Sequence, residues 1–115
     1  MTNSELPPDA IRRELISILH NSELKNSVVL SNFLEFVVTE KLAANGGQIK
    51  EYTIGIQALG RPIDFNPQMD ATVRIHAGRL RKVLNDYYSN QGKEDEIVIS
   101  IPRGPMFRFL NPEKI

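Results

Sequence analysis

The sequence contains no cysteine and only two histidines among its 115 residues. Without cysteine there is neither a disulfide framework nor thiolate chemistry, and two histidines alone argue against a structural zinc site. We therefore expect no metal and no cofactor. The lack of cysteine also fits a reducing compartment, so the expected location is the cytoplasm.

An excess of charge is missing as well. The 14 lysines and arginines balance 14 aspartates and glutamates, which gives a formal net charge of zero. The molecule as a whole therefore has no general attraction to nucleic acid or to an anionic membrane, and any such attraction has to be local.

Long apolar runs are absent too. The longest, FLEFVVTEKLA, is broken by Glu35, Glu40 and Lys41, and the N-terminus is acidic and lacks an apolar core region. These features predict neither a transmembrane helix nor a signal peptide, and no membrane partner.

The length suits one domain with a single modest core, and 41% hydrophobic with 24% charged residues is an ordinary globular composition. We expect a flexible N-terminus at 1–7, one domain over 8–110 and a tail at 111–115. No internal repeat is visible.

Three helices are expected in the first half. Pro8 suits a first helical turn, and apolar residues then recur at helical spacing, which predicts an extra N-terminal helix over 8–21. A second helix is expected from about 26 to 44. Residues 51–60 favour a short helix, although their β-branched residues would also suit a strand, and QIKEY at 48–52 could be a single pairing strand.

The second half is expected to form a loop, a long helix and a hairpin. The loop at 61–69 contains two prolines, and Asp64 and Asp70 nearby suit turn and cap roles better than a cation site. A helix is then expected over 69–89. The β-rich runs IVISI and MFRFL, joined by PRGP, predict a hairpin over 97–110. The expected fold class is mainly α with a C-terminal β-hairpin.

TVRIHAGRLRKVL, residues 72–84, carries four basic side chains and no acidic one. At 100° per residue, one side is apolar and suits a core, with His76 at its margin. Gly78 lies on the opposite, basic arc of the helix and lowers helix stability by roughly 1 kcal/mol relative to alanine. This cost is better explained if a partner approaches the helix backbone closely there. The simpler alternative is a solvated helix face. The apolar side is formed by Val73, Ala77, Leu80, Val83, Leu84, Tyr87 and Tyr88, and the basic arc by Arg74, Gly78, Arg79, Arg81 and Lys82.

The order of helices, basic helix and hairpin is that of a winged helix-turn-helix. In that architecture the last helix enters the DNA major groove and the hairpin tip reaches flanking phosphates or the minor groove. Arg103 sits at the tip, next to Gly104 and between Pro102 and Pro105. Alternatively, PRGP simply closes a hairpin and the arginine serves solubility.

TVRIHAGRLRKVL also resembles the recognition helix of the OmpR/PhoB-type winged-helix domains of response regulators, typically Thr-Val-Asp-Val-His-Ile, two variable residues, Leu-Arg-Lys. ISIPRGPMFRF resembles their closing hairpin, and FLEFVV and KEYTIGIQALG are placed like their first and positioning helices. The resemblance spans about 27–110. Residues 49–88 resemble more closely an uncharacterised bacterial module that precedes tetratricopeptide, TolB-like or cyclase domains.

The resemblance to response regulators implies a role for each site residue. Arg79 falls where that family reads a base, and Arg103 where its wing enters the minor groove. The chain departs from the family in the basic Arg74, in Pro105 and Met106 at the wing, and in lacking the N-terminal sheet and a receiver domain. The implied DNA-backbone contacts are Thr72, Arg74, His76, Arg81 and Lys82, and we include Gly78 and Arg108 in the expected site.

The sequence thus predicts double-stranded DNA binding without chemistry, by a small bacterial or mobile-element transcriptional regulator. A homodimer on adjacent half-sites is expected, because a small domain with few basic contacts binds weakly alone. No pair of residues suggests a catalytic dyad with His76, so we expect no enzyme. The alternative is a protein-interaction module that uses the 61–69 loop, around Phe65 and Pro67, to assemble with itself or a partner.

Overall fold

The computed structural model describes residues 7–43, 49–101 and 113–114. The chain is mainly helical, as the sequence predicted. Helix α1 (Pro8–Asn21), the short 3₁₀ helix η1 (Glu23–Asn26) and α2 (Val28–Leu42) are followed by α3 (Glu51–Thr53), the π-helix η3 (Ile54–Ala58) and α4 (Thr72–Ser89), and the chain ends with the strands β1 (Ile97–Val98) and β2 (Glu113–Lys114).

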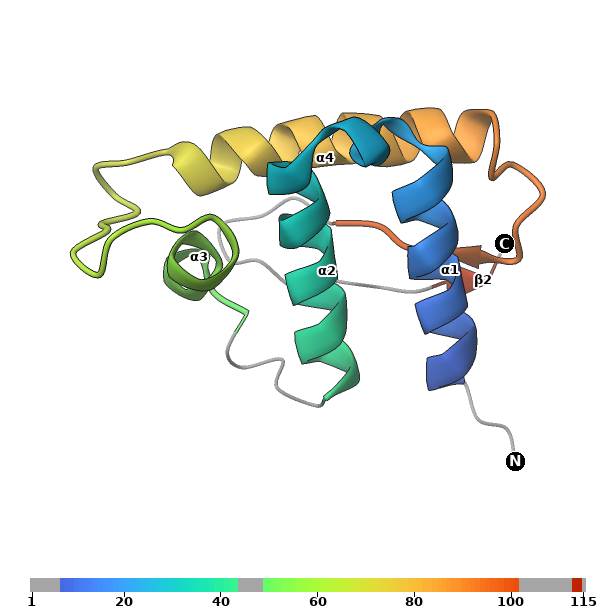
Figure 1. The fold of residues 1–115 in the computed structure, drawn as a ribbon, viewed down its shortest axis with the longest axis horizontal. Helices are drawn as coiled ribbons and strands as arrows, with labels where there is room; N and C mark the ends of the chain where they lie inside the picture. Colours follow the sequence, from blue (N-terminus) through green and yellow to red (C-terminus); the bar gives the residue numbers. More distant parts are fainter. Residues whose placement is uncertain (1–6, 44–48, 102–112, 115) are drawn as a thin grey trace.

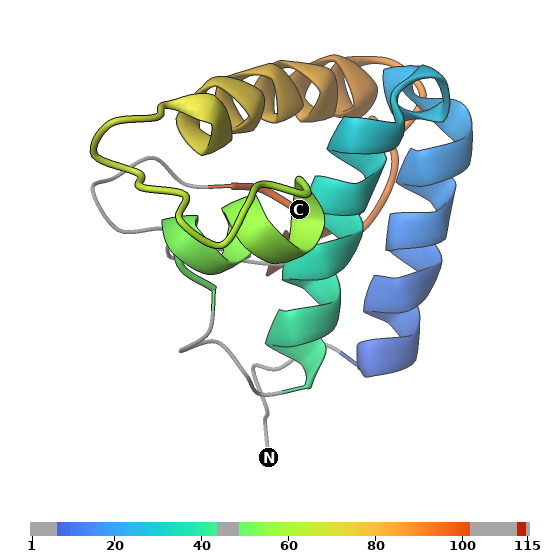
Figure 2. The ribbon, with the colours of Figure 1, turned by 60° about the vertical axis from the view of Figure 1, so that its left-hand side comes forward.

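Helices α1 and α2 form a hairpin that is closed by η1, and α4 lies across the closed end of this hairpin (Figure 1). Helices α3 and η3 pack beside α2, below the N-terminal part of α4 (Figure 2). The arrangement supports α4 along one side and leaves its opposite side uncovered by any other described helix.

Two serines close the hairpin. The Ser22 hydroxyl donates to the carbonyl oxygen of Ile18 at 2.6 Å and accepts from the Leu24 amide at 3.0 Å. Ser27 caps α2 by accepting from the Leu30 amide at 3.1 Å. Because these hydroxyls satisfy backbone groups that a helix end leaves open, the chain can reverse over a few residues.

The core lies where the three long helices meet. The predicted apolar side of α4 is confirmed, because five of its seven residues are buried and the other two, Val83 and Tyr88, are half-buried and pack against the core. Most of the apolar residues of α1 and α2 are buried as well. Ile99 and Ile101, which follow β1, also enter the core. The largest fully buried side chains are Phe33, Ile18, Leu24, Leu34, Ile54, Leu80 and Ile99.

Residues 51–58 are helical, so the strand alternative for this segment is wrong. The helix widens into a π-helix at Ile54–Ala58. The ring of Phe65 packs directly on Gly55, where a β-carbon would lie 2.4 Å from the ring. Only glycine leaves room for this contact.

The expected boundaries of α4 and the hairpin need correction. Helix α4 begins at Thr72 and not at residue 69, because residues 61–71 form the loop. Only Ile97–Val98 of the predicted strand 97–101 is in the β conformation, and it pairs antiparallel with Glu113–Lys114. Glu113–Lys114 lie within the expected tail at 111–115 and form strand β2. The second predicted strand, 106–110, and the PRGP tip lie outside the described residues.

No helix within the described ranges is long and apolar enough to cross a membrane.

Candidate functional site

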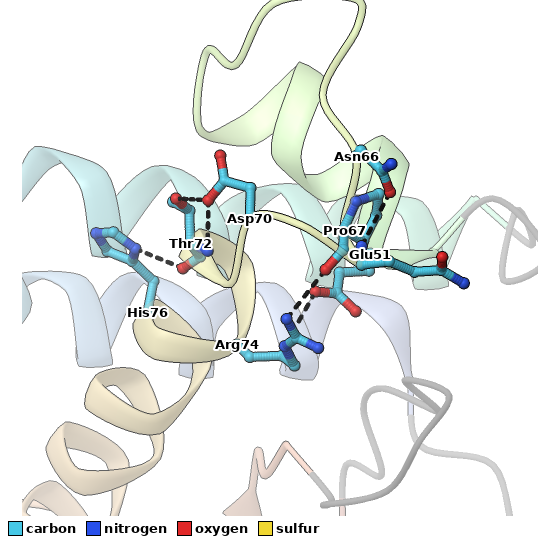
Figure 3. Close-up of polar contacts among 8 residues, drawn as sticks. Glu51, Asn66, Pro67, Asp70, Thr72, Arg74 and His76 are labelled. Atoms are coloured by element: carbon cyan, nitrogen blue, oxygen red, sulfur yellow. Dashed lines mark hydrogen bonds and ion pairs between the residues drawn. The ribbon is translucent and has the colours of Figure 1, made fainter.

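The start of α4 is fixed by Asp70. Its Oδ1 accepts from the Thr72 amide at 3.0 Å and from the Thr72 hydroxyl (Figure 3). Its Oδ2 lies 2.8 Å from Arg61 Nη2. The bonds from Thr72, with a smaller contribution from Arg61, lower the pKa of Asp70. Asp70 thus has the cap role that the sequence favoured. The Thr72 hydroxyl, predicted to contact DNA, is bound to Asp70.

Arg74 joins α4 to α3 and to the loop. Its Nε lies 3.4 Å from Glu51 Oε2, and its Nη2 donates to the carbonyl oxygen of Pro67 at 3.0 Å (Figure 3). Glu51 Oε2 is buried and has no hydrogen-bond partner among the described residues, so this ion pair is its charge compensation. Burial raises the pKa of Glu51, and Arg74 opposes that rise. The Arg74 side chain, although 51% exposed, therefore already has two partners within the protein.

His76 bonds within its own helix. Its Nδ1 donates to the carbonyl oxygen of Thr72 at 2.8 Å, and the side chain is half-buried. This contact fixes the ring against the first turn of α4 (Figure 3).

Arg81 faces the C-terminal segment. Its Nε donates to the carbonyl oxygen of Ile101 at 2.8 Å, and the side chain is half-buried. Ile101 is the last described residue before the PRGP tip. Arg81 therefore ties α4 to the base of the predicted wing.

The remaining basic residues lie on a row of exposed positions along α4, which we call the outward strip: Ile75, Gly78, Arg79, Lys82 and Asp86. Arg79 makes no hydrogen bond or ion pair with any residue that the structure describes. Lys82 Nζ lies 3.5 Å from Asp86 Oδ2, with side chains 78% and 60% exposed. A pair this exposed contributes little to stability. A β-carbon added at Gly78 would meet nothing within 4 Å outside its own helix, so no described contact requires glycine there.

The predicted site residues thus fall into two groups. Gly78, Arg79 and Lys82 share the outward strip, whereas Thr72, Arg74 and Arg81 bind residues outside α4 and His76 bonds within α4. Arg103 and Arg108 lie outside the described residues. Ile75 was not predicted to lie on either the apolar side or the basic arc of the helix. Its spacing of four residues from Arg79 is the sequence signal that places it on the outward strip.

The apolar surface of the loop differs from the prediction. Phe65 is 6% exposed and stacks on Tyr52, with ring centroids 6.4 Å apart. The exposed apolar side chains of the loop are instead Ile63, 82% exposed, and Met69, 83% exposed.

A polar cluster between α1 and α4 was not predicted from the sequence. The Tyr88 hydroxyl donates to Glu14 Oε2 at 2.7 Å and accepts from the Ile99 amide at 3.0 Å. Glu14 is 9% exposed. Burial raises the pKa of Glu14 to about 7, while the Tyr88 hydrogen bond lowers it and Asp95 adds to the rise. The cluster joins α1, α4 and the segment after β1.

Tyr87 completes this cluster. Its hydroxyl donates to Asp95 Oδ2 at 3.0 Å and lies 2.8 Å from Ser17 Oγ, which therefore donates to it. Tyr87 is 2% exposed, which confirms the prediction of a core tyrosine. Its ring also lies where a side chain at Gly92 would be, so the turn after α4 is held close to the helix.

No protein-family model matches the chain, and comparisons with curated proteins and with solved structures likewise gave no match.

Proposed function

We propose that this domain is a winged-helix-like module that binds double-stranded DNA through the outward strip of α4. The observation that carries the proposal is Arg79, an exposed arginine with no partner among the described residues, next to a glycine with open space above it. An arginine held away from the chain's own carboxylates keeps its full set of donors for a ligand.

The roles follow from the chemistry of the groups. The Arg79 guanidinium suits a bidentate contact with guanine O6 and N7 in the major groove. Gly78 allows a DNA strand to approach the helix backbone closely. Lys82 suits a phosphate, because the Asp86 carboxylate beside it is exposed and competes weakly.

Arg74 and Arg81 act as positioning residues in this proposal. They hold α4 against α3, the loop and the segment before the tip. With so few free basic groups on the strip, one domain binds weakly, and tight binding requires two copies on adjacent half-sites. This is the binding mode of a small transcriptional regulator.

Fluorescence anisotropy with random duplexes, followed by selection of a preferred site, tests the proposal. Arg79→Ala is expected to cost about 1 to 3 kcal/mol on the selected site and to relax its sequence preference. Arg13→Ala is the matched control, because Arg13 is likewise exposed but lies on α1. Equal binding by wild type, Arg79→Ala and Arg13→Ala at every salt concentration would contradict DNA binding through the strip.

A second candidate function is self-association through the 61–69 loop, which the exposure of Ile63 and Met69 favours. Sedimentation velocity over a range of concentrations should then show dimers that Ile63→Ser with Met69→Ser abolishes. Ile16→Ser, at an exposed apolar position of α1, is the control. A monomer at every concentration would contradict this function.

A further inference from the structure

Ile75 occupies an unusual place on the outward strip. It is 52% exposed, whereas its sequence neighbours Arg74 and His76 are engaged in polar contacts, Arg74 with Glu51 and Pro67 and His76 with the Thr72 carbonyl oxygen of its own helix. Nearby on the strip are Gly78, Arg79 and Lys82, which are small or charged. A bulky apolar side chain therefore projects from the face that carries the free arginine.

The core does not require Ile75. The side of α4 that packs inward is filled by Val73, Ala77 and Leu80, which are 0% exposed, and Ile75 is not part of this cluster. No described contact of the fold explains an isoleucine at this position.

We propose that Ile75 is a specificity-determining residue that contacts the 5-methyl group of thymine in the DNA major groove. The inference rests on the proposed function. The thymine methyl is the apolar group on the major-groove edges of the bases, so an aliphatic side chain distinguishes thymine by contact with it. A phosphate group, in contrast, presents charged oxygens and no apolar surface for an aliphatic side chain to contact.

The spacing on the helix fixes which base Ile75 reads relative to Arg79. Side chains four residues apart on one helix face are about 5 to 6 Å apart at their β-carbons. Successive base pairs are about 3.4 Å apart along the DNA axis. The thymine therefore lies one or two base pairs from the guanine that Arg79 contacts. Ile75 is also β-branched, so few side-chain rotamers are lost when it binds.

The test uses DNA that lacks one methyl group. After the preferred duplex has been selected, each thymine is replaced singly by deoxyuridine, and binding is measured by competition at one salt concentration. One replacement, one or two base pairs from the Arg79-dependent guanine, should weaken wild-type binding by about fourfold, the effect of one buried methyl group. Ile75→Ala should bind both duplexes equally at that position.

The control variant is Lys82→Ala, which should weaken binding to both duplexes alike and keep the wild-type sensitivity to the missing methyl. Ile75 is exposed, so Ile75→Ala should melt at the wild-type temperature.

The two proposals fail in different ways. In one outcome, the wild type binds the duplex through Arg79 while no deoxyuridine replacement weakens binding, or Ile75→Ala remains sensitive to the missing methyl group. Either result contradicts the role of Ile75 and leaves the proposal of DNA binding intact. If no duplex is bound, both proposals are wrong, and a partner protein is the remaining ligand for the strip.

Discussion

Arg81 and Ile101, twenty positions apart in the sequence, are joined by a 2.8 Å hydrogen bond from Nε to the carbonyl oxygen. Arg74 likewise binds Glu51 and Pro67. Two of the four basic side chains in TVRIHAGRLRKVL therefore hold the fold together, and Arg79 and Lys82 remain on its exposed face.

Arg81→Ala should lower the free energy of unfolding by roughly 1 to 3 kcal/mol, because it leaves the Ile101 carbonyl without its charged donor. Lys82→Ala, one position away and exposed, should change it by no more than about 0.5 kcal/mol. Urea unfolding of the two variants measures the difference. Equal stabilities would show that the contact of Arg81 with Ile101 does not support the fold.

Arg74→Ala should destabilise the protein, because the buried Oε2 of Glu51 then loses its ion pair. Adding Glu51→Gln should recover part of the loss, since a neutral amide costs less to bury. A double-mutant cycle by urea unfolding should give a coupling of about 0.5 to 1.5 kcal/mol. Strictly additive effects would mean that the two side chains do not interact.

Stability should fall as the pH rises between about 4.5 and about 7, because folding raises the pKa of Glu14 from 4.5 to about 7. In this range the folded protein holds a proton that the unfolded chain has released, so higher pH favours unfolding. The contribution stays below about 1.4 kcal/mol per pH unit, because one carboxyl group takes up at most one proton.

Glu14→Gln is the control for this pH dependence. Its amide oxygen still accepts from the Tyr88 hydroxyl but does not titrate. The variant should gain stability relative to wild type as the pH rises, which thermal melts at several pH values measure. A constant difference between the two proteins would exclude Glu14 as the source.

Gly78→Ala should stabilise the protein by about 1 kcal/mol, because alanine favours the helix and its methyl group meets open space. Gly55→Ala should instead destabilise it by about 1 to 3 kcal/mol, because the new β-carbon would overlap the Phe65 ring. Urea unfolding separates the two. If the proposed function holds, the stabilised Gly78→Ala protein should also bind DNA more weakly than wild type.

Local sequence patterns predicted most of the helical structure. Pro8 marked the start of α1, Ser27 lay at the start of α2, and apolar spacing identified the buried side of α4. These signals lie within one or two helical turns, so a single sequence contains them.

The remaining features depend on residues that are distant in sequence. The π-helix at Ile54–Ala58 accompanies the packing of Phe65 on Gly55, ten positions away. Helical spacing placed Arg74 and Arg81 on a basic arc but gave no information about their acceptors, which lie on other segments. The pairing of β1 with Glu113–Lys114 was missed for the same reason.

The cluster of Tyr87 and Tyr88 gives the protein a built-in optical probe. The chain has no tryptophan and three tyrosines, and two of these three, Tyr87 and Tyr88, have their rings packed edge to face. The Tyr88 hydroxyl donates to Glu14 and the Tyr87 hydroxyl bonds with Ser17, both on α1, and these two contacts are lost when α1 separates from α4. Tyrosine absorbance and fluorescence therefore report the docking of these helices without any added label.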